Sequence, residues 1–383
     1  MYYNVCNNFC IDNTISFGGI NMKKFRRIGV LTSGGDAPGM NAAIRAITRK
    51  ALEQGVEVMG IIGGYSGLIN ENIIPLTTGA VSNIITHGGT ILYSDRCKEF
   101  KTEEGMQKAI ATCKKFNIDA IVAIGGDGTF RGATDLTLHG IPAIGVTGTI
   151  DNDITATDYT VGFDTAMNTV LEAVDRLRDT CESHARCDVV EVMGRDCGQI
   201  ALMAGIASGA VAICIPEVPF DEELAIEKIK SAKAAGKRGM IVVVSEGVTA
   251  VDENGKTVPY GELLRSRIED QTGVETKFAR LAHVVRGGSP TLRDRLTATK
   301  MGVVAVELLL EGKSNRVVIE DNGEITDLDI LFALTVDRMY KNKLKEGDLE
   351  KFSEADIDEM RKICEKRTEE IDILYKMSYE ICK

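Results

Sequence analysis

Three glycine-rich turns carry the residues that could do chemistry, and each follows a short apolar run. They read TSGGDAPGMN at residues 32–41, GGDGT at residues 125–129 and TGTIDNDI at residues 147–154. Free backbone N–H groups and the positive helix end at a strand-to-helix turn favour an anion. The first turn matches neither GxGxxG nor GxxxxGK(S/T), so neither a dinucleotide-binding fingerprint nor a P-loop follows.

Carboxylates in the second and third turns are the candidate reacting groups. Asp127 stands among amides that could cradle a phosphate, which makes chemical sense if it holds Mg²⁺, because the cation bridges carboxylate and phosphate oxygens. Asp151 and Asp153 are two residues apart, so in extended backbone both side chains point to the same side. One could receive a proton from a substrate hydroxyl while the other approaches the metal. Each turn alone could also be a packing turn, a helix cap or a solvated loop.

The elements that position these turns alternate in type along the chain. Apolar runs followed by helical segments lie at residues 26–34, 56–64, 120–126 and 141–148. Such alternation predicts βαβ units and a parallel sheet covered on both faces, with ligands bound at the carboxyl ends of the strands, where the three turns fall. After a long predicted helix at residues 164–181 the alternation repeats. The sequence therefore predicts an α/β fold of two Rossmann-like domains.

Composition excludes several classes of protein. The chain has 383 residues, 44% of them hydrophobic and 26% charged, and no apolar run approaches the roughly 18 residues that a membrane-spanning helix needs. A net charge of −11 and the absence of Trp argue against a nucleic-acid binder. The ten cysteines include no CxxC pair, so they fit reduced thiols in a cytoplasmic chain better than a disulfide framework or a zinc site.

Both ends of the chain differ from the two predicted domains. The first 22 residues contain no Lys or Arg and do not resemble a secretory signal. We expect residues 1–22 to be a disordered extension, and translation could begin at Met1 or at Met22. After about Lys341 the chain becomes charge-dense with a helical period. We expect residues 342–383 to form a charged surface helix that is not part of a site; it could cover a subunit face or be solvated, and the charge density favours the second.

Several motifs together resemble one family. IGVLTSGGDAPGMNAAIR, IGGDGT, GTIDNDI, TDYTVGFDTA, EVMGR and RGGSP stand in the order and spacing of bacterial 6-phosphofructokinases, which the chain resembles from about Lys24 to Leu334. The resemblance implies two α/β domains with the active site in the cleft between them. It implies transfer of the γ-phosphoryl of ATP to O1 of fructose 6-phosphate, a step of glycolysis, by a cytoplasmic homotetramer. We expect an ATP-binding domain at residues 23–160 plus about 275–325, and a fructose 6-phosphate domain at about 161–274 plus 326–341.

The family pattern also implies individual roles. Asp151 would be the general base, Thr149 and Arg195 would stabilise the phosphoryl group in transit, and Asp127 and Asp153 would serve Mg²⁺. The ATP site would be lined by Gly35, Arg96, Cys97, Gly126, Asp127, Gly128 and Thr129. The sugar phosphate would be held by Thr149, Ile150, Asp151, Met193, Gly194, Arg195, Glu246, His283 and Arg286. A neighbouring subunit would add Arg186 and Lys277. Lys277 stands where an Arg is usual and lacks its bidentate fork, so Arg280 could substitute for it.

Two further features concern the phosphoryl donor and the effectors. Pyrophosphate-dependent relatives typically carry Asp where Gly128 stands and Lys where Gly148 stands, so the glycines favour ATP. Three alternatives remain: a pyrophosphate-dependent enzyme, a kinase for another sugar phosphate, or a catalytically silent sugar-phosphate sensor, which would be expected to lose one of the carboxylates. Bacterial relatives bind ADP or phosphoenolpyruvate at a second site. The basic pattern of that site is matched by Arg45, Arg49, Arg178 and Lys237, whereas Thr78, Val211 and Ala235 depart from it. We therefore expect a weakened or altered effector response.

Overall fold

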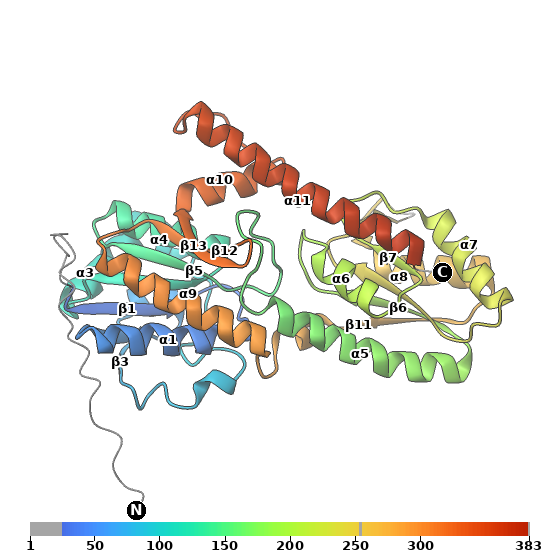
Figure 1. Cartoon of the computed structure of the whole chain (residues 1–383), viewed down its shortest axis with the longest axis horizontal. Helices are drawn as coiled ribbons and strands as arrows, with labels where there is room; N and C mark the ends of the chain where they lie inside the picture. Colours follow the sequence, from blue (N-terminus) through green and yellow to red (C-terminus); the bar gives the residue numbers. More distant parts are fainter. Residues whose placement is uncertain (1–24, 253–254, 382–383) are drawn as a thin grey trace, which may run out of the picture.

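The computed structural model describes residues 25–252 and 255–381. Figure 1 shows two α/β domains along the long axis of the molecule, with a long helix lying across both. Each domain is built around its own sheet, so the predicted fold of two Rossmann-like α/β domains is confirmed. The expectations for residues 1–22, including the choice between Met1 and Met22, lie outside the described residues.

The first domain contains a seven-stranded sheet in the order β13-β12-β5-β4-β1-β2-β3. Its five inner strands are parallel, while β3 and β13 run antiparallel at the two edges. Strand β4 reads AIVAIG and is buried along its whole length, which is typical of a parallel strand covered on both faces. The strands are β1 Arg27–Thr32, β2 Glu57–Ile61, β3 Ile73–Leu76, β4 Ala120–Gly125, β5 Ala143–Thr147, β12 Arg316–Asp321 and β13 Glu324–Asp329.

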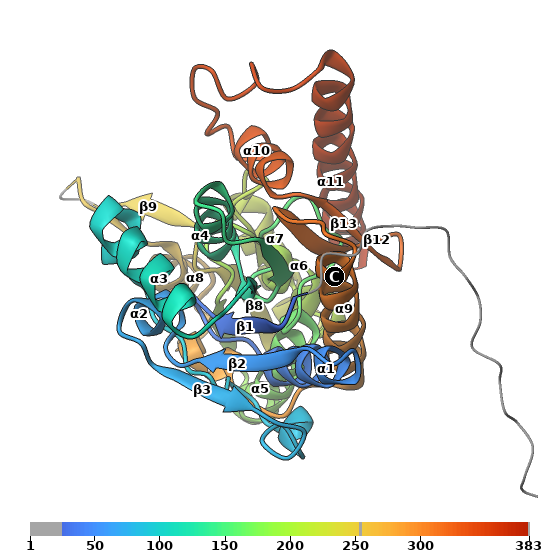
Figure 2. The same cartoon turned by 90° about the vertical axis from the view of Figure 1, so that its left-hand side faces the viewer.

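Helices cover both faces of this sheet because alternate side chains of each strand point to opposite sides. Val30 and Val122 belong to the core under α1 (Met40–Glu53) and α9 (Leu292–Leu310). Leu31 and Ile121 face the other core. That second core is covered by α2 Gly64–Ile69, α3 Glu103–Lys115, α4 Asp127–Leu138 and α10 Ile330–Tyr340. Figure 2 shows α1 and α9 on one side of β1 and α4 on the other.

The second domain contains a four-stranded parallel sheet in the order β11-β6-β8-β7. Helix α5 leads into it from the first domain. The strands are β6 Cys187–Val192, β7 Ala212–Cys214, β8 Met240–Ser245 and β11 Thr276–Arg280, with a small hairpin of β9 Thr249–Val251 and β10 Thr257–Pro259. The helices are α5 Phe163–His184, α6 Gln199–Ala207, α7 Glu222–Ala234 and α8 Tyr260–Thr272, and the short 3-10 segments of the chain are η1 Ile84–Thr86, η2 Glu99–Lys101 and η3 Ala282–Arg286.

Two boundaries of the expected domain division are wrong. Strand β11 pairs with β6, so the start of the 275–325 segment belongs to the second sheet. Strand β13 pairs with β12 and α10 packs on α4, so most of the 326–341 segment belongs to the first domain. The hairpin between β12 and β13 turns at Asn322 and Gly323, both with positive φ. Asn-Gly is a strong local signal for a two-residue hairpin, so the sequence contained the evidence for this pairing.

The C-terminal helix α11 (Glu354–Ile381) is not a merely solvated surface helix, as the sequence had suggested. It contacts α10 of the first domain and α6 and β7 of the second, and Figure 1 shows it crossing from one domain to the other. Its buried residues recur at three- to seven-residue intervals and so form one face: Met360, Arg367, Ile371, Tyr375 and Ser378. The charge density of the segment concealed this packed face. Across the described part of the chain, no helix combines the length and apolarity needed to cross a bilayer.

Candidate active site

The three glycine-rich turns lie together at the carboxyl ends of β1, β4 and β5. These strands are neighbours in the parallel sheet, so their following turns meet at one edge. The Oγ1 atom of Thr129 donates a hydrogen bond to the carbonyl of Ser33 at 3.0 Å. The backbone N–H of Gly148 donates to the carbonyl of Gly125 at 2.9 Å. The sheet therefore joins the turns into one surface.

Asp151 is the most buried carboxylate of this surface, with a relative exposure of 2%. Its backbone N–H donates to Oγ1 of Thr149 at 3.2 Å. Its Oδ1 atom has no hydrogen-bond partner among the described residues, and the nearest cation contact is Nη2 of Arg286 at 3.8 Å. Burial, followed by repulsion from Asp153, raises the pKa of Asp151 to about 6, against the opposing charges of Arg286 and Arg195. Such a group can accept a proton near neutral pH.

Asp153 lies among both cations and carboxylates. Nη1 of Arg195 is 3.4 Å and Nζ of Lys341 is 3.9 Å from Oδ2 of Asp153. Burial raises the pKa of Asp153, the charges of Lys341 and Arg195 lower it, and those of Asp337 and Asp127 raise it. The charges of Asp127 and Asp153 therefore repel each other.

These two carboxylates fit a divalent cation. Asp127 stands in the first turn of α4, where Nη2 of Arg131 is 2.8 Å from its Oδ2. No group of three or more potential His, Cys, Asp or Glu ligands occurs within residues 25–252 and 255–381. Mg²⁺ characteristically takes one or two carboxylates and completes its shell with water and substrate phosphates. The donor set present is thus of the kind that Mg²⁺ uses beside a phosphate.

The glycines at the rim of the site differ in the space around them. A Cβ atom at Gly35 would lie 2.8 Å from Nη1 of Arg286, so this turn and the arginine pack closely. A Cβ at Gly128 would meet nothing within 4 Å. A Cβ at Gly148 would lie 3.1 Å from Cγ2 of Ile124 and 3.3 Å from Cε of Met40. Position 128 therefore opens onto free space, whereas position 148 tolerates a side chain only if its neighbours move slightly.

The remaining first-domain residues of the predicted set lie around these turns. Ile150 is fully buried and Gly126 stands at the start of α4. Arg96 is exposed and Cys97 half-buried in the segment that follows Asp95. Asp95 accepts hydrogen bonds from Oγ of Ser66 and from the backbone N–H of Arg96. These two hydrogen bonds order the segment that carries Arg96 and Cys97.

The second domain contributes a tight turn after β6. Oε1 of Glu246 accepts from the backbone N–H groups of Gly194 at 3.3 Å and Arg195 at 3.0 Å. Gly194 has φ 145 and Arg195 has φ 54, in the left-handed region that a non-glycine residue seldom adopts. The carboxylate of Glu246 therefore stabilises a strained turn that directs Arg195 toward Asp153. Met193 is buried directly before this turn.

His283 and Arg286 lie on η3, which follows β11. His283 is exposed, whereas Arg286 reaches the first domain, where its Nη1 donates to the carbonyl of Asp36 at 3.3 Å. Arg286 thus contacts the first glycine-rich turn and approaches Asp151 from the connection to the second domain. The structure therefore places Arg286 beside Asp151.

Arg186 and Lys277 lie away from these residues of the same chain. Both pair with Oε1 of Glu275, at 3.0 and 2.9 Å, near the amino ends of β6 and β11. Met193 follows the opposite end of β6, and a six-residue strand spans roughly 20 Å. Arg280 stands nearer the site end of β11 and pairs with Glu191 at 2.5 Å. This chain alone therefore does not place Arg186 or Lys277 in its own site.

The four predicted effector cations also lie apart in one chain. Arg45 and Arg49 are on α1 of the first domain, Arg178 is on α5, and Lys237 follows α7 of the second. Figure 1 shows α1 and α7 at opposite ends of the molecule. The turns bearing Thr78 and Ala235 are likewise in different domains.

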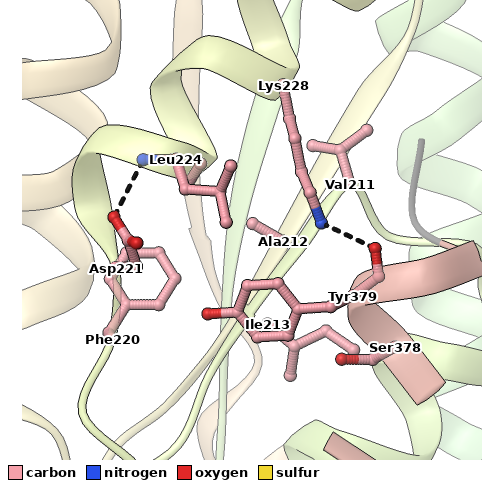
Figure 3. A pocket seen from close by; sticks show the side chains of 10 residues that line it. Val211, Ala212, Ile213, Phe220, Asp221, Leu224, Lys228, Ser378 and Tyr379 are labelled. Atoms are coloured by element: carbon pink, nitrogen blue, oxygen red, sulfur yellow. Dashed lines mark hydrogen bonds between the residues drawn. The ribbon is translucent and has the colours of Figure 1, made fainter. Parts of the chain in front are cut away.

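Val211, which departs from the expected effector pattern, is buried beside the last turn of α11 (Figure 3). It lines a cavity of about 10 Å³ together with Lys228 and Tyr379. Nζ of Lys228 lies 4.7 Å from the centre of the Tyr379 ring and 3.3 Å from its carbonyl oxygen. A space of this size holds about one water molecule and no nucleotide.

Sequence reasoning missed two cations that contact the turn of residues 147–154, the Asp151 turn. Nζ of Lys341 donates to the carbonyl of Asp153 at 2.9 Å and to Oδ2 of Asp337 at 2.9 Å. Nη2 of Arg367 donates to the carbonyl of Asn152 at 3.1 Å. Both cations lie at the start of, or within, the charge-dense C-terminal segment, where local pattern cannot separate a packed cation from a solvated one. The seven described cysteines are free thiols, as expected for them: 97, 113, 181, 187, 197, 214 and 364.

Comparisons with known proteins place this geometry in a family. Residues 27–309 match the family described as Phosphofructokinase. Over 319 residues the chain is 52% identical to an ATP-dependent 6-phosphofructokinase of Clostridium botulinum strain Hall, covering 83% of this chain and 97% of that protein. Over 321 residues it is 52% identical to the ATP-dependent 6-phosphofructokinase of Bacillus licheniformis, covering 82% and 98%.

Solved structures agree on the fold. A phosphofructokinase from Saccharomyces cerevisiae has a TM-score of 0.76 and 32% identity to this chain, covering 83% of it. The chain spans 46% of the length of that yeast chain. A pyrophosphate-dependent phosphofructokinase from Marinobacter aquaeolei has a TM-score of 0.69 and 23% identity, covering 80% of this chain and 83% of its own, and this likeness shows the fold alone.

Proposed function

Because the chain belongs to the phosphofructokinase family, we propose that it is an ATP-dependent 6-phosphofructokinase. It transfers the γ-phosphoryl of ATP to O1 of fructose 6-phosphate and gives fructose 1,6-bisphosphate and ADP. The observation that carries the assignment is Asp151, a buried carboxylate with a raised pKa and an unpartnered oxygen at the meeting point of three glycine-rich turns. A general base for a sugar hydroxyl needs an unpaired oxygen lone pair together with a pKa near neutral.

The residues of this chain divide the work of phosphoryl transfer. Asp151 accepts the proton of the sugar O1 hydroxyl as that oxygen attacks the γ-phosphorus. Arg195 and Thr149 stabilise the charge on the transferred group, and Arg286 supports the sugar phosphate from η3. Such transfer depends on positioning and charge neutralisation rather than on covalent catalysis. Glu246 contributes by holding the turn that presents Arg195.

Asp127 and Asp153 would hold Mg²⁺ with the phosphates of ATP. When bound, the cation would neutralise charge on the phosphate oxygens. In the protein itself, Lys341 and Arg195 limit the cost of keeping Asp153 ionised in a buried position. Magnesium binding should therefore depend more on Asp153 than on the exposed charge of Arg131, which lies beside Asp127 on α4.

ATP is the proposed donor in preference to pyrophosphate. The open space at Gly128 leaves room for the remainder of a nucleotide beyond the transferred phosphate. The side chain that pyrophosphate-dependent relatives carry at position 148 would press on Met40 and Ile124. A silent sugar-phosphate sensor is disfavoured because Asp127, Asp151 and Asp153 are all present.

We further propose a cytoplasmic homotetramer with an altered effector site. Arg186 and Lys277 lie near the amino ends of β6 and β11, away from the site of their own chain. They could therefore bind the sugar 6-phosphate only in the site of another copy. Arg45 and Arg49 could meet Arg178 and Lys237 only across an interface, because the two pairs lie on different domains of one chain. The apolar Val211 packs near Tyr379 and offers no carboxylate to a magnesium-bound ADP. We therefore expect weaker responses to ADP and phosphoenolpyruvate than in relatives with the full set.

A coupled assay tests the activity directly. Purified protein is supplied with fructose 6-phosphate and Mg²⁺, and product is measured with ATP and, separately, with pyrophosphate. Turnover with ATP and little with pyrophosphate is expected. The converse donor preference would establish the pyrophosphate alternative, and binding of fructose 6-phosphate without turnover from either donor would establish the sensor.

A further inference from the structure

Helix α11 lies outside the part of the chain that matches the family, residues 27–309, yet it packs behind the Asp151 turn. It runs from α10 to α6 and β7 and so touches both domains. Figures 1 and 2 show it as a single helix across the molecule. A helix so placed can act on the turn that carries Asp151 and Asp153 without facing the substrates.

Arg367 is the residue of α11 that reaches this turn. Its relative exposure is 7%. Its Nη2 atom donates to the carbonyl oxygens of Asn152 at 3.1 Å and Thr157 at 3.3 Å. These contacts join two points of the backbone that are five residues apart. The arginine is planar and rigid, so it fixes the relative position of both carbonyls.

Asn152 needs such support because its backbone is unusual. It stands between Asp151 and Asp153 with φ 48, in the left-handed region. This conformation directs the flanking carboxylates, and it costs free energy unless the surroundings hold it. The side chain of Asn152 is also fixed, since its Nδ2 atom donates to the carbonyl of Asp158 at 3.2 Å.

The second domain joins the same buried cluster. The side-chain amide of Gln199, at the start of α6, lies 2.6 Å from Nδ2 of Asn152 and 2.9 Å from Nη1 of Arg367. Glu217 accepts from the backbone N–H of Gly198 at 2.7 Å. Burial raises the pKa of Glu217, and the charge of Arg367 opposes that rise. Arg367 is therefore embedded among polar groups of both domains, where a missing donor cannot be replaced easily by water.

A neighbouring lysine anchors the same stretch of α11. Nζ of Lys366 lies 3.0 Å from Oδ1 of Asp158 and 3.5 Å from Oδ1 of Asp321. Lys366 is more exposed than Arg367 and its pairs are screened by solvent. The buried contacts of Arg367 thus carry most of the coupling between the helix and the turn.

We propose that Arg367 is a positioning residue for phosphoryl transfer, holding the backbone at Asn152 so that Asp151 meets the sugar hydroxyl and Asp153 faces the metal. This inference rests on the proposed kinase activity. Arg367 touches main-chain oxygens of the turn and neither substrate. Its loss should lower kcat while fructose 6-phosphate still binds, because misplacing a catalytic group by about 1 Å can cost about 100-fold in rate.

The test compares three variants of the full chain. Arg367→Met removes the donors but keeps a long apolar stem, and Arg367→Lys keeps a charge and a donor. Arg361→Met is the matched control, because Arg361 is exposed on the same helix and pairs only with Asp358 in the described contacts. For each protein, kcat and KM come from the coupled assay, the Kd for fructose 6-phosphate from calorimetry, and Tm from thermal unfolding.

We expect Arg361→Met to stay within about twofold of wild type in every quantity. Arg367→Met should lose about 10- to 100-fold in kcat with a Kd for the sugar phosphate within about threefold, and Arg367→Lys should recover part of the loss. Wild-type kcat in folded Arg367→Met would overturn the inference, and so would a parallel loss of kcat, sugar affinity and Tm without recovery in the lysine variant.

Three further outcomes keep the test decisive. If Arg367→Met does not fold, the lysine variant decides: a reduced kcat at wild-type Tm supports positioning, and a wild-type kcat refutes it. Absence of turnover in the wild-type protein would refute the proposed function and this inference together. Wild-type turnover with unimpaired Arg367 variants would refute this inference alone.

Discussion

Replacing Asp151 with Asn should separate catalysis from stability. The asparagine is nearly isosteric and cannot take the proton of the sugar hydroxyl, so kcat should fall by orders of magnitude. In the folded protein the pKa of Asp151 is raised from 3.8 to about 6. A difference of about two pKa units corresponds to about 3 kcal/mol, which is the cost of keeping this carboxylate ionised in the folded state. The inactive variant should therefore be the more stable protein at pH 8.

The sign of this effect depends on pH. A folded-state pKa above the unfolded value means that the folded protein holds its proton more tightly. The folded state therefore has its full advantage below about pH 4, and the wild type loses it progressively as pH rises through 6. Asp151→Asn lacks this titration. Its gain over wild type should be close to zero near pH 4 and should approach about 3 kcal/mol at pH 8, as an upper limit.

Urea unfolding of ligand-free protein at pH 5, 6.5 and 8 measures this difference. Asp270→Asn is the control, because Asp270 is exposed on α8 and its removal should change unfolding little at any pH. The assay is repeated for kcat at each pH. Equal urea midpoints for wild type and Asp151→Asn across this range would refute the conclusion that burial raises the pKa of Asp151. Appreciable turnover by the variant would refute its role as base.

The remaining predictions concern the donor, the substrate turn and the domain connection. Gly148→Lys should reduce turnover with ATP by at least about tenfold, because its side chain must displace Met40; unchanged ATP kinetics would contradict this reading. Glu246→Ala should raise KM for fructose 6-phosphate about 10- to 100-fold with KM for ATP little changed, because the turn presenting Arg195 loses its acceptor; equal changes in both KM values would count against it. Asp294→Ala should destabilise the protein by about 3–5 kcal/mol in urea unfolding, because a buried carboxylate that accepts from Tyr159 and from backbone groups is lost; a loss under about 1 kcal/mol would contradict that role.

Much of the fold could be predicted because its signals are local. Buried parallel strands such as Ala120–Gly125 are continuous apolar runs, and each ends in a glycine-rich turn. The edge strand Thr276–Arg280 was assigned to the wrong domain because its short, partly exposed sequence carries a weak signal and its parallel partner is distant in sequence. The local sequence pattern indicates whether a segment is a helix or a strand. Which strand it pairs with in a parallel sheet depends on the fold of the whole chain, because parallel partners are separated by long connections.

The same limit applies to α11. Its charges suggested a solvated helix. The structure shows instead that Met360, Ile371 and Tyr375 are buried on one face of α11, which packs on both domains. Hydrophobic residues in a highly charged helix are too few to distinguish a packed face from chance spacing. The helix is therefore the part of the molecule in which sequence reasoning was least informative.

By itself, the sequence determined the α/β architecture and the family, and it singled out the candidate carboxylates, because strand, turn and motif are short-range patterns and parallel strands bring their carboxyl ends to one edge. Only the tertiary structure decided the environment of those carboxylates. The burial that raises the pKa of Asp151 comes from packing of the whole site. Lys341 and Arg367 contact the turn of residues 147–154 from 188 and 215 residues away in sequence, a distance over which no local pattern reports a contact.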